Sequence, residues 1–220
     1  MSRRKRKKSR KSPTPQTAQP PAATFPDPEV TIYTDGGCVF NPGPGGYGAV
    51  LLCGEHRREL SAGFRKTTNN RMEIMAAIAG LEALKRPCSV VIWSDSQYLV
   101  NAIELGWAKR WKSHSWWRNR DERALNPDLW ERLLELCAIH QVHFRWLRGH
   151  AGHEHNERCD ALARNATAAR DLRIDRVYED LVQATPTLGS NHGDSFHFTE
   201  GGVTATPTRK RTHPSRRAGK

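Results

Sequence analysis

Three stretches of the chain show the hydrophobic pattern of strands. From residue 30 to 35 (VTIYTD) two sets of side chains alternate, and Gly36-Gly37 follows directly. This period of two predicts a strand that ends at Asp35. Residues 88–93 (CSVVIW) form a continuous apolar run, typical of a strand buried on both faces, and Asp95 comes soon after it. A third strand is predicted at 142–146.

Apolar residues at helical spacing predict three helices. The first covers the apolar positions of 74–84, with Asn70 as its N-cap and Glu73 three residues later, as in a capping box. Asn126-Pro127 starts the second, because proline suits the first helical position. The third helix is expected over residues 156–169.

Four carboxylates lie where these elements begin or end: Asp35, Glu73, Asp95 and Asp160. Each lies among small or amide residues rather than basic partners. Taken singly, Glu73 is equally well explained by a capping box, and Asp160 by the dipole of its helix. Carboxylates aimed at one point repel one another unless a cation joins them. The four together therefore indicate a metal site.

Four motifs in one order carry a family resemblance. They are TDGG with the turn NPGPGGYGAV, TTNNRMEIMAAIAGLEAL, SDSQY, and GHAGHEHNERCDALAR. In order and spacing they resemble ribonuclease H of type 1, the bacterial ribonuclease HI group, over about residues 28–170. The resemblance implies an α/β fold, with a five-stranded mixed sheet of order 3-2-1-4-5 flanked by helices. It also implies cleavage of the RNA strand of an RNA–DNA hybrid.

The resemblance implies that Asp35, Glu73, Asp95 and Asp160 are the metal ligands, with Asp35 bridging two ions. Two cations about 4 Å apart can activate a water, stabilise charge on a phosphate and support the leaving oxygen. Magnesium prefers oxygen ligands, so a carboxylate set without thiolates suits Mg²⁺ better than zinc. Whether Mn²⁺ substitutes stays open. The family would leave a 3′-hydroxyl and a 5′-phosphate.

His150 lies in a glycine-flanked loop after the third strand, where a mobile imidazole can move protons. By resemblance it assists proton transfer or product release. An alternative is a zinc site made of His150, His153, His155 and Cys159. That set lacks a Cys-x-x-Cys pair, which makes zinc the less favoured interpretation. A catalytically silent hybrid-binding protein is a second alternative, although all four acids are present.

Further residues are expected to contact the substrate. The glycine-rich turn after Asp35 lets the backbone approach RNA closely, although an ordinary hairpin turn would explain it equally. The resemblance implies that Cys38 and Asn41 contact the RNA strand. It also implies that Thr68, Asn69 and Asn70 contact the DNA strand and that Gln97 lies near the minor groove. Arg71 either holds a phosphate or pairs with a neighbouring acid.

A segment rich in tryptophan and basic residues covers 107–120. Such a mixture suits a surface that follows a phosphate backbone, although about half of its four rings are expected to be packing. By resemblance this segment is the basic protrusion, or handle, that grips the DNA strand. Its expected contacts are Trp107, Trp111 and Lys112.

Length and composition indicate in which cellular compartment the protein is expected. The 220 residues suffice for one substantial domain, and no apolar run reaches the roughly 18 residues that a membrane span requires. The cysteines are five in number and scattered, which is typical of reduced thiols. We expect a cytoplasmic monomer without membrane contact.

The net charge of +12 lies in the ends of the chain. Residues 1–12 hold eight basic and no acidic residues and 209–220 hold six and none, so subtracting these fourteen leaves −2 for the remainder. We expect disordered tails at 1–27 and 189–220 that bind nucleic acid non-specifically, around a ribonuclease H domain at 28–170 and a helical or irregular extension at 171–188. The start lacks the features of a secretory or transit peptide, whereas a nuclear signal stays open.

Overall fold

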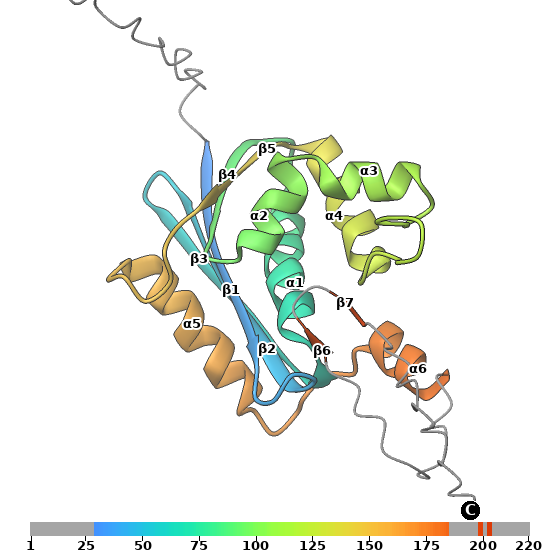
Figure 1. The fold of residues 1–220 in the computed structure, drawn as a ribbon. Coiled ribbons are helices and arrows are strands. Elements are labelled where there is room, and N and C mark those ends of the chain that lie inside the picture. The colour runs from blue at the N-terminus through green and yellow to red at the C-terminus, as the bar shows by residue number, and fades with distance from the viewer. Residues whose placement is uncertain (1–28, 185–197, 200–201, 204–220) are drawn as a thin grey trace, which may run out of the picture.

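A computed structural model describes residues 29–184, 198–199 and 202–203 (Figure 1). The predicted tail 1–27 and most of the tail 189–220 lie outside these residues. Within the second tail, two short strands pair antiparallel: β6 (Phe198–Thr199) and β7 (Gly202–Val203).

Five strands form one mixed sheet in the order β3-β2-β1-β4-β5, as the resemblance implied. The antiparallel part is made of β1 (Val30–Cys38), β2 (Gly43–Cys53) and β3 (His56–Thr67). The parallel part adds β4 (Ser89–Ser94) and β5 (Gln141–Trp146) to β1. The predicted end of the first strand at Asp35 is wrong, because β1 continues to Cys38 through its pairing with β2, whereas its pairing with β4 stops at Thr34 and Ser94.

Helices cover both faces of the sheet (Figure 1). One face carries α1 (Asn69–Glu82), α2 (Gln97–Glu104), α3 (Trp107–Ser113) and α4 (Pro127–Ile139). The other face carries α5 (Glu154–Thr167). A last helix, α6 (Arg176–Ala184), follows α5. No helix in the described part of the chain is both long and apolar enough to cross a membrane.

The main core lies between the sheet and the first of these helix layers. Val30, Ile32 and Thr34 are buried on this side of β1, which confirms the alternation expected for residues 30–35. Their partners across the layer include Ile74 of α1 and Trp130 of α4, both fully buried. Burial of such large apolar side chains stabilises the fold by ~1.5–3 kcal/mol each.

The prediction that residues 88–93 are buried on both faces is wrong. Val90 and Ile92 are fully buried, whereas Val91 and Trp93 on the other face are only partly covered. The reason is the placement of α5, which packs mainly on β1, β2 and β3 and so leaves the α5 side of β4 less covered.

The close packing of α5 on the sheet depends on small residues in β2. A Cβ atom added at Gly48 would lie 2.2 Å from the carbonyl oxygen of Cys159, so only glycine permits this approach. Helix α5 begins at Glu154 rather than at the predicted residue 156. Asp160 consequently lies in the middle of the helix, and Glu154 and Glu157 occupy the first turn, where the helix dipole acts.

Helix α1 begins differently from the prediction. Its N-cap is Thr68 rather than Asn70, and the Thr68 hydroxyl accepts a hydrogen bond from the Arg71 amide at 3.4 Å. Threonine in extended conformation is a good N-cap, which makes a second cap two residues later unnecessary. The capping-box explanation of Glu73 is therefore wrong, and its carboxylate is available for another purpose.

Residues 171–184 pack against the end of β3. Arg173 exchanges backbone hydrogen bonds with the strand, donating from its amide to Gly63 at 2.8 Å and accepting from Arg65 at 3.0 Å. The guanidinium of Arg65 also binds the carboxylate of Glu179 in α6, at 2.6 Å. The chain after residue 170 thus continues the folded domain.

Candidate active site

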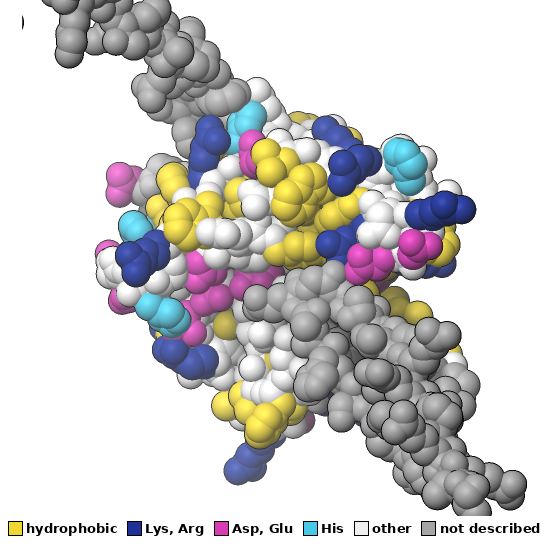
Figure 2. All heavy atoms as spheres, viewed as in Figure 1, with side chains coloured by type: hydrophobic (Ala, Val, Ile, Leu, Met, Phe, Trp, Pro, Cys, Tyr) yellow, Lys and Arg dark blue, Asp and Glu magenta, His cyan; other side chains and the backbone are white. Residues whose placement is uncertain are grey.

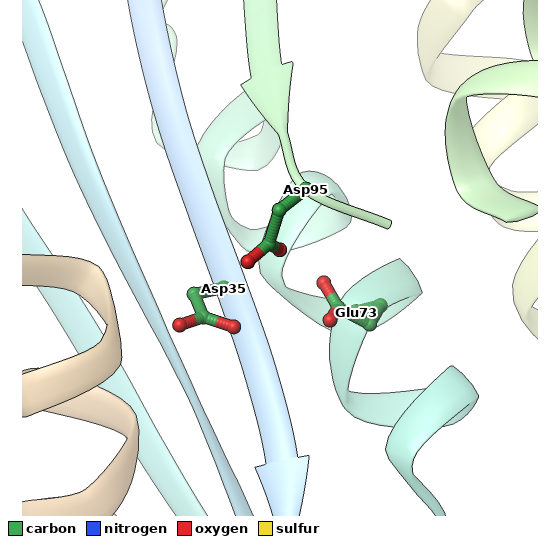
Figure 3. A group of neighbouring side chains, drawn as sticks. All are labelled: Asp35, Glu73 and Asp95. Carbon is green, nitrogen blue, oxygen red and sulfur yellow. The ribbon is translucent and has the colours of Figure 1, made fainter. Parts of the chain in front are cut away.

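Three carboxylates from three elements meet where β4 ends beside β1, in the interior of the sheet (Figure 3). Asp35 lies in β1, Asp95 follows β4 directly, and Glu73 lies in the second turn of α1. One oxygen atom from each lies within 4.8 Å of the others. Among the residues that the structure describes, these form the one group of three or more potential metal ligands.

The register of the sheet explains this convergence. Thr34 of β1 pairs with Ser94 of β4 in parallel, so the next residues, Asp35 and Asp95, emerge side by side. Glu73 reaches them because α1 crosses β1 at Gly36. A Cβ atom at Gly36 would lie 2.5 Å from the backbone nitrogen of Glu73, which a side chain would prevent.

Ionisation of the carboxyl groups at this site is unfavourable. Burial, followed by repulsion from Asp95 and Asp160, raises the pKa of Asp35 to about 7. Burial, with repulsion from Asp35 and Asp95, raises the pKa of Glu73 well above its usual value. The buried Oε2 of Glu73 finds no hydrogen-bond partner within the described ranges. A bound cation would remove both penalties, so these residues fit a divalent metal ion.

Asp160 and His150 lie at the rim of this group. Both line a cavity of about 680 Å³ that also contains Asp35 and Asp95. Figure 2 shows acidic side chains gathered near the middle of this face. The expectation that the four acids lack basic partners is wrong for Asp160, since Arg164 donates to its Oδ2 at 2.5 Å. One helical turn separates the two residues, which a sequence reading can recognise.

The zinc hypothesis is wrong for Cys159. Its thiol is buried and donates to the carbonyl of Tyr33 at 3.2 Å, and burial raises its pKa to about 12. Among the described residues, no group of three or more potential metal ligands includes Cys159. His155 instead packs at a tilt against the ring of Tyr33, with centroids 4.9 Å apart.

The predicted substrate residues around the first turn form a connected group. The Cys38 amide donates to Oδ1 of Asn69 at 2.8 Å, and the Asn69 amide donates to Oδ1 of Asn41 at 3.2 Å. The turn between β1 and β2 is thereby fixed to the start of α1. Thr68 and Asn70 flank Asn69, and Gln97 is exposed at the start of α2, two residues after Asp95.

The tryptophan segment divides into core and surface. Trp111 is only 3% exposed and packs on Trp130 at 6.0 Å, so its ring supports the handle from inside. Trp107 is half-buried, and Lys112 pairs with Glu131 at 3.0 Å. The exposed ring is Trp117, at 41%, which had not been singled out as a contact.

Of the two roles expected for Arg71, the structure shows pairing with acidic side chains. Its buried guanidinium binds Asp128 at the start of α4 and Asp175 before α6. Val39 and Arg164 were missed altogether as residues lining the cavity of Asp35. Val39 gives no sequence signal of a site, because apolar side chains in turns are common.

The fold and the carboxylate group define an α/β protein whose mixed sheet carries a cluster of carboxylates that could hold a metal ion. Over residues 27–168 the sequence matches the family described as RNase H, and the chain belongs to the ribonuclease H family. It is 64% identical over 162 residues to a ribonuclease H of Syntrophus aciditrophicus, covering 72% of this chain and 94% of that protein. A ribonuclease HI of Synechocystis is 61% identical over 135 residues, covering 61% of this chain and 84% of that protein.

A solved structure agrees with this placement. LC9-RNase H1, described as a type 1 RNase H with the type 2 active-site motif, superposes with a TM-score of 0.59 at 30% identity. The match covers 72% of this chain and 82% of that one. The fold implied by the sequence motifs is thus confirmed, and the chain groups with the bacterial type 1 enzymes.

Proposed function

We propose that this protein is an endonuclease that hydrolyses the RNA strand of RNA–DNA hybrids with the help of Mg²⁺. The observation that carries the proposal is the meeting of Asp35, Glu73 and Asp95, with one oxygen atom from each within 4.8 Å. Such a group is costly without a cation and suits a hard, oxygen-seeking ion. Membership of the ribonuclease H family supports the reaction and the substrate.

The residues that hold the metal are Asp35, Glu73, Asp95 and Asp160. Burial, together with the charges of both Asp95 and Asp160, raises the pKa of Asp35, and Asp35 would be a ligand to the ions if two were bound. When bound, a pair of Mg²⁺ ions supplies a nucleophilic water and neutralises charge on the phosphate and the leaving oxygen. Mn²⁺ has similar ligand preferences and is expected to substitute.

Asp160 and His150 act from the rim. The Oδ2 atom of Asp160 pairs with Arg164, while the charge of Asp160 also acts on Asp35. His150 is exposed in its loop and has φ of 51°, beside the cavity of Asp35. It passes a proton to or from solvent as the products, a 3′-hydroxyl and a 5′-phosphate, leave.

The hybrid lies across the site in a direction set by its predicted contacts. Cys38 and Asn41 approach the RNA, Thr68, Asn69 and Asn70 approach the DNA, and Gln97 faces the minor groove. The handle binds the DNA backbone through Trp107 and Lys112, supported by the buried Trp111.

The catalytic unit comprises residues 28–170 with the extension 171–188, whose described part, 171–184, packs against β3. The tails 1–27 and 189–220 bind nucleic acid through charge alone. All five cysteines fall in the described part of the chain and are free thiols, which fits the reducing cytoplasm. We propose that the protein acts there as a monomer.

An end-labelled RNA–DNA hybrid tests the function. Internal cuts in the RNA strand are expected in Mg²⁺ and none in EDTA, with the DNA strand intact. Binding of the hybrid without any cleavage in Mg²⁺ or Mn²⁺ would instead support a catalytically silent binding protein.

A further inference from the structure

We propose that Phe40 is a substrate-positioning residue, whose ring packs against the sugars in the minor groove of the bound hybrid. The inference rests on the proposed function. It adds to the site an apolar contact beside the predicted polar contacts of Cys38 and Asn41.

Phe40 combines two unfavourable features. Its side chain is 83% exposed, the largest exposed fraction among the large apolar residues of the described chain. Its backbone has φ of 62°, a left-handed conformation that costs a bulky residue about 1 kcal/mol or more. Glycine would remove the strain, and a polar residue would remove the exposure. Neither feature stabilises the fold, which points to a contact outside the chain.

The turn that carries Phe40 is fixed on both sides. Cys38 is held through the Asn69 side chain and Asn41 through the Asn69 amide. Within the turn, the Val39 amide donates to the carbonyl of Pro44 at 2.8 Å. The ring is therefore presented from an ordered support, and little conformational freedom of the backbone is lost when it binds.

The position of the turn selects the partner. The cavity that contains Asp35 and Asp95 extends to Val39 and Pro44, the neighbours of Phe40 in the turn. In Figure 1 this turn lies at the lower end of β1 and β2. Because one cavity joins the turn to the carboxylates, a duplex bound at Asp35 and Asp95 also meets the turn that carries Phe40.

The chemistry of the turn selects the kind of contact. Residues 38–44 (CVFNPGP) contain no charged side chain, so the turn cannot attract phosphates by charge. A hybrid with A-form character presents a wide, shallow minor groove lined by sugars and base edges. An exposed phenyl ring packs well against these apolar sugar faces. The contact should therefore add affinity that does not depend on salt, unlike contacts made by Lys and Arg.

Phe40→Gly tests the proposal, with Phe40→Tyr as the conservative variant. Ile139→Ala is the matched control, because Ile139 is also an exposed apolar residue, at 54%, but lies at the end of α4, next to the start of β5. KM for the hybrid, kcat and the dependence of KM on salt concentration are measured for each, together with the midpoint of thermal unfolding.

We expect Phe40→Gly to raise KM about fivefold or more, with a smaller change in kcat and an unchanged salt dependence. Its unfolding midpoint should equal or exceed that of the wild type, because the strain is relieved. Phe40→Tyr should keep KM within about twofold, since an aromatic ring is retained. If Phe40→Gly has the same KM as the wild type, the proposal for Phe40 is overturned while the proposed function stands. If the wild-type protein itself does not cut hybrids, the proposed function is refuted.

Discussion

Arg71 and Asp175 form a buried ion pair that joins the start of α1 to the segment before α6. The guanidinium donates to both carboxylate oxygens of Asp175, at 2.6 and 2.8 Å, and both side chains are almost inaccessible. Thr67 adds a hydrogen bond to Asp175 at 2.9 Å. Since Glu73 lies two residues after Arg71, this pair also anchors the turn of helix that supplies the metal site.

Loss of one partner should be costly. Asp175→Ala leaves Arg71 buried with Asp128 as its remaining acid, so we expect the free energy of unfolding to fall by about 3 kcal/mol. Urea denaturation measures this change. Glu82→Ala, which removes the exposed pair with Arg132, serves as the control and should cost less than about 1 kcal/mol. Equal effects of the two variants would refute the structural role of the buried pair.

The stability of the metal-free protein should depend on Asp35. Its pKa in the fold is about 7, above the usual 3.8, so the folded state keeps a proton that the unfolded chain has lost between these values. The contribution of this bound proton to the free energy of unfolding is complete below pH 4 and is lost as the pH rises through 7. Asp35→Asn should therefore stabilise the protein in EDTA by about 2 kcal/mol at pH 8 and by much less at pH 4.

Denaturation curves at the two pH values measure this difference. Asp121→Asn, a change at an exposed acid of the segment after α3, is the control and should show no such dependence. An Asp35→Asn variant that is equally stabilised at both pH values would show that ionisation of the buried Asp35 carboxyl is not the cause.

His150→Ala should slow turnover but leave measurable cleavage. The side chain is exposed at the rim of the cavity, and water can replace it in moving protons. A loss of about 10²–10⁴-fold in kcat is typical for such a group. Steady-state kinetics on a hybrid give the value, with His153→Ala of the same loop as the control. A loss as complete as that of a metal ligand would contradict an auxiliary role.

The charged tails should control affinity without controlling chemistry. Their fourteen basic residues raise the local concentration of the domain on any polyanion, and such binding weakens as salt displaces it. Deletion of residues 1–24 and 190–220 should weaken hybrid binding and flatten its salt dependence, while the cleavage pattern stays the same. Equal salt slopes for the full and trimmed chains would assign the tails to another purpose.

The local sequence pattern was sufficient to predict part of the candidate site but not the contacts between distant residues. Alternation in residues 30–35 identified the strand that carries Asp35, although β1 continues to Cys38, and the parallel register with β4 then fixes Asp95 beside it. The partners of Arg71 were not predictable, because Asp128 and Asp175 are 57 and 104 residues away in sequence. The second face of β4 was mispredicted for the same reason, since its cover depends on where α5 packs.

The start of α1 was mispredicted because it involves a contact between distant residues. Thr68, Asn69 and Asn70 are all acceptable N-caps, and Thr68 takes this position while the Asn69 side chain accepts a hydrogen bond from the Cys38 amide. That contact joins two elements and cannot be inferred from either alone. The motifs identified the family, whereas packing of particular side chains distinguished the exposed Trp117 from the buried Trp111.

Cleavage of an end-labelled RNA–DNA hybrid by Asp35→Asn, in Mg²⁺ and beside the wild type, tests the central claim most directly. The variant removes a carboxylate at the point where the charges of Asp95 and Asp160 also act, and it leaves the first turn and the handle unchanged. We expect no detectable cleavage by the variant, with a hybrid Kd within about threefold of the wild type, because binding depends mainly on contacts outside the metal centre. Near-normal cleavage by Asp35→Asn in Mg²⁺ would contradict the account.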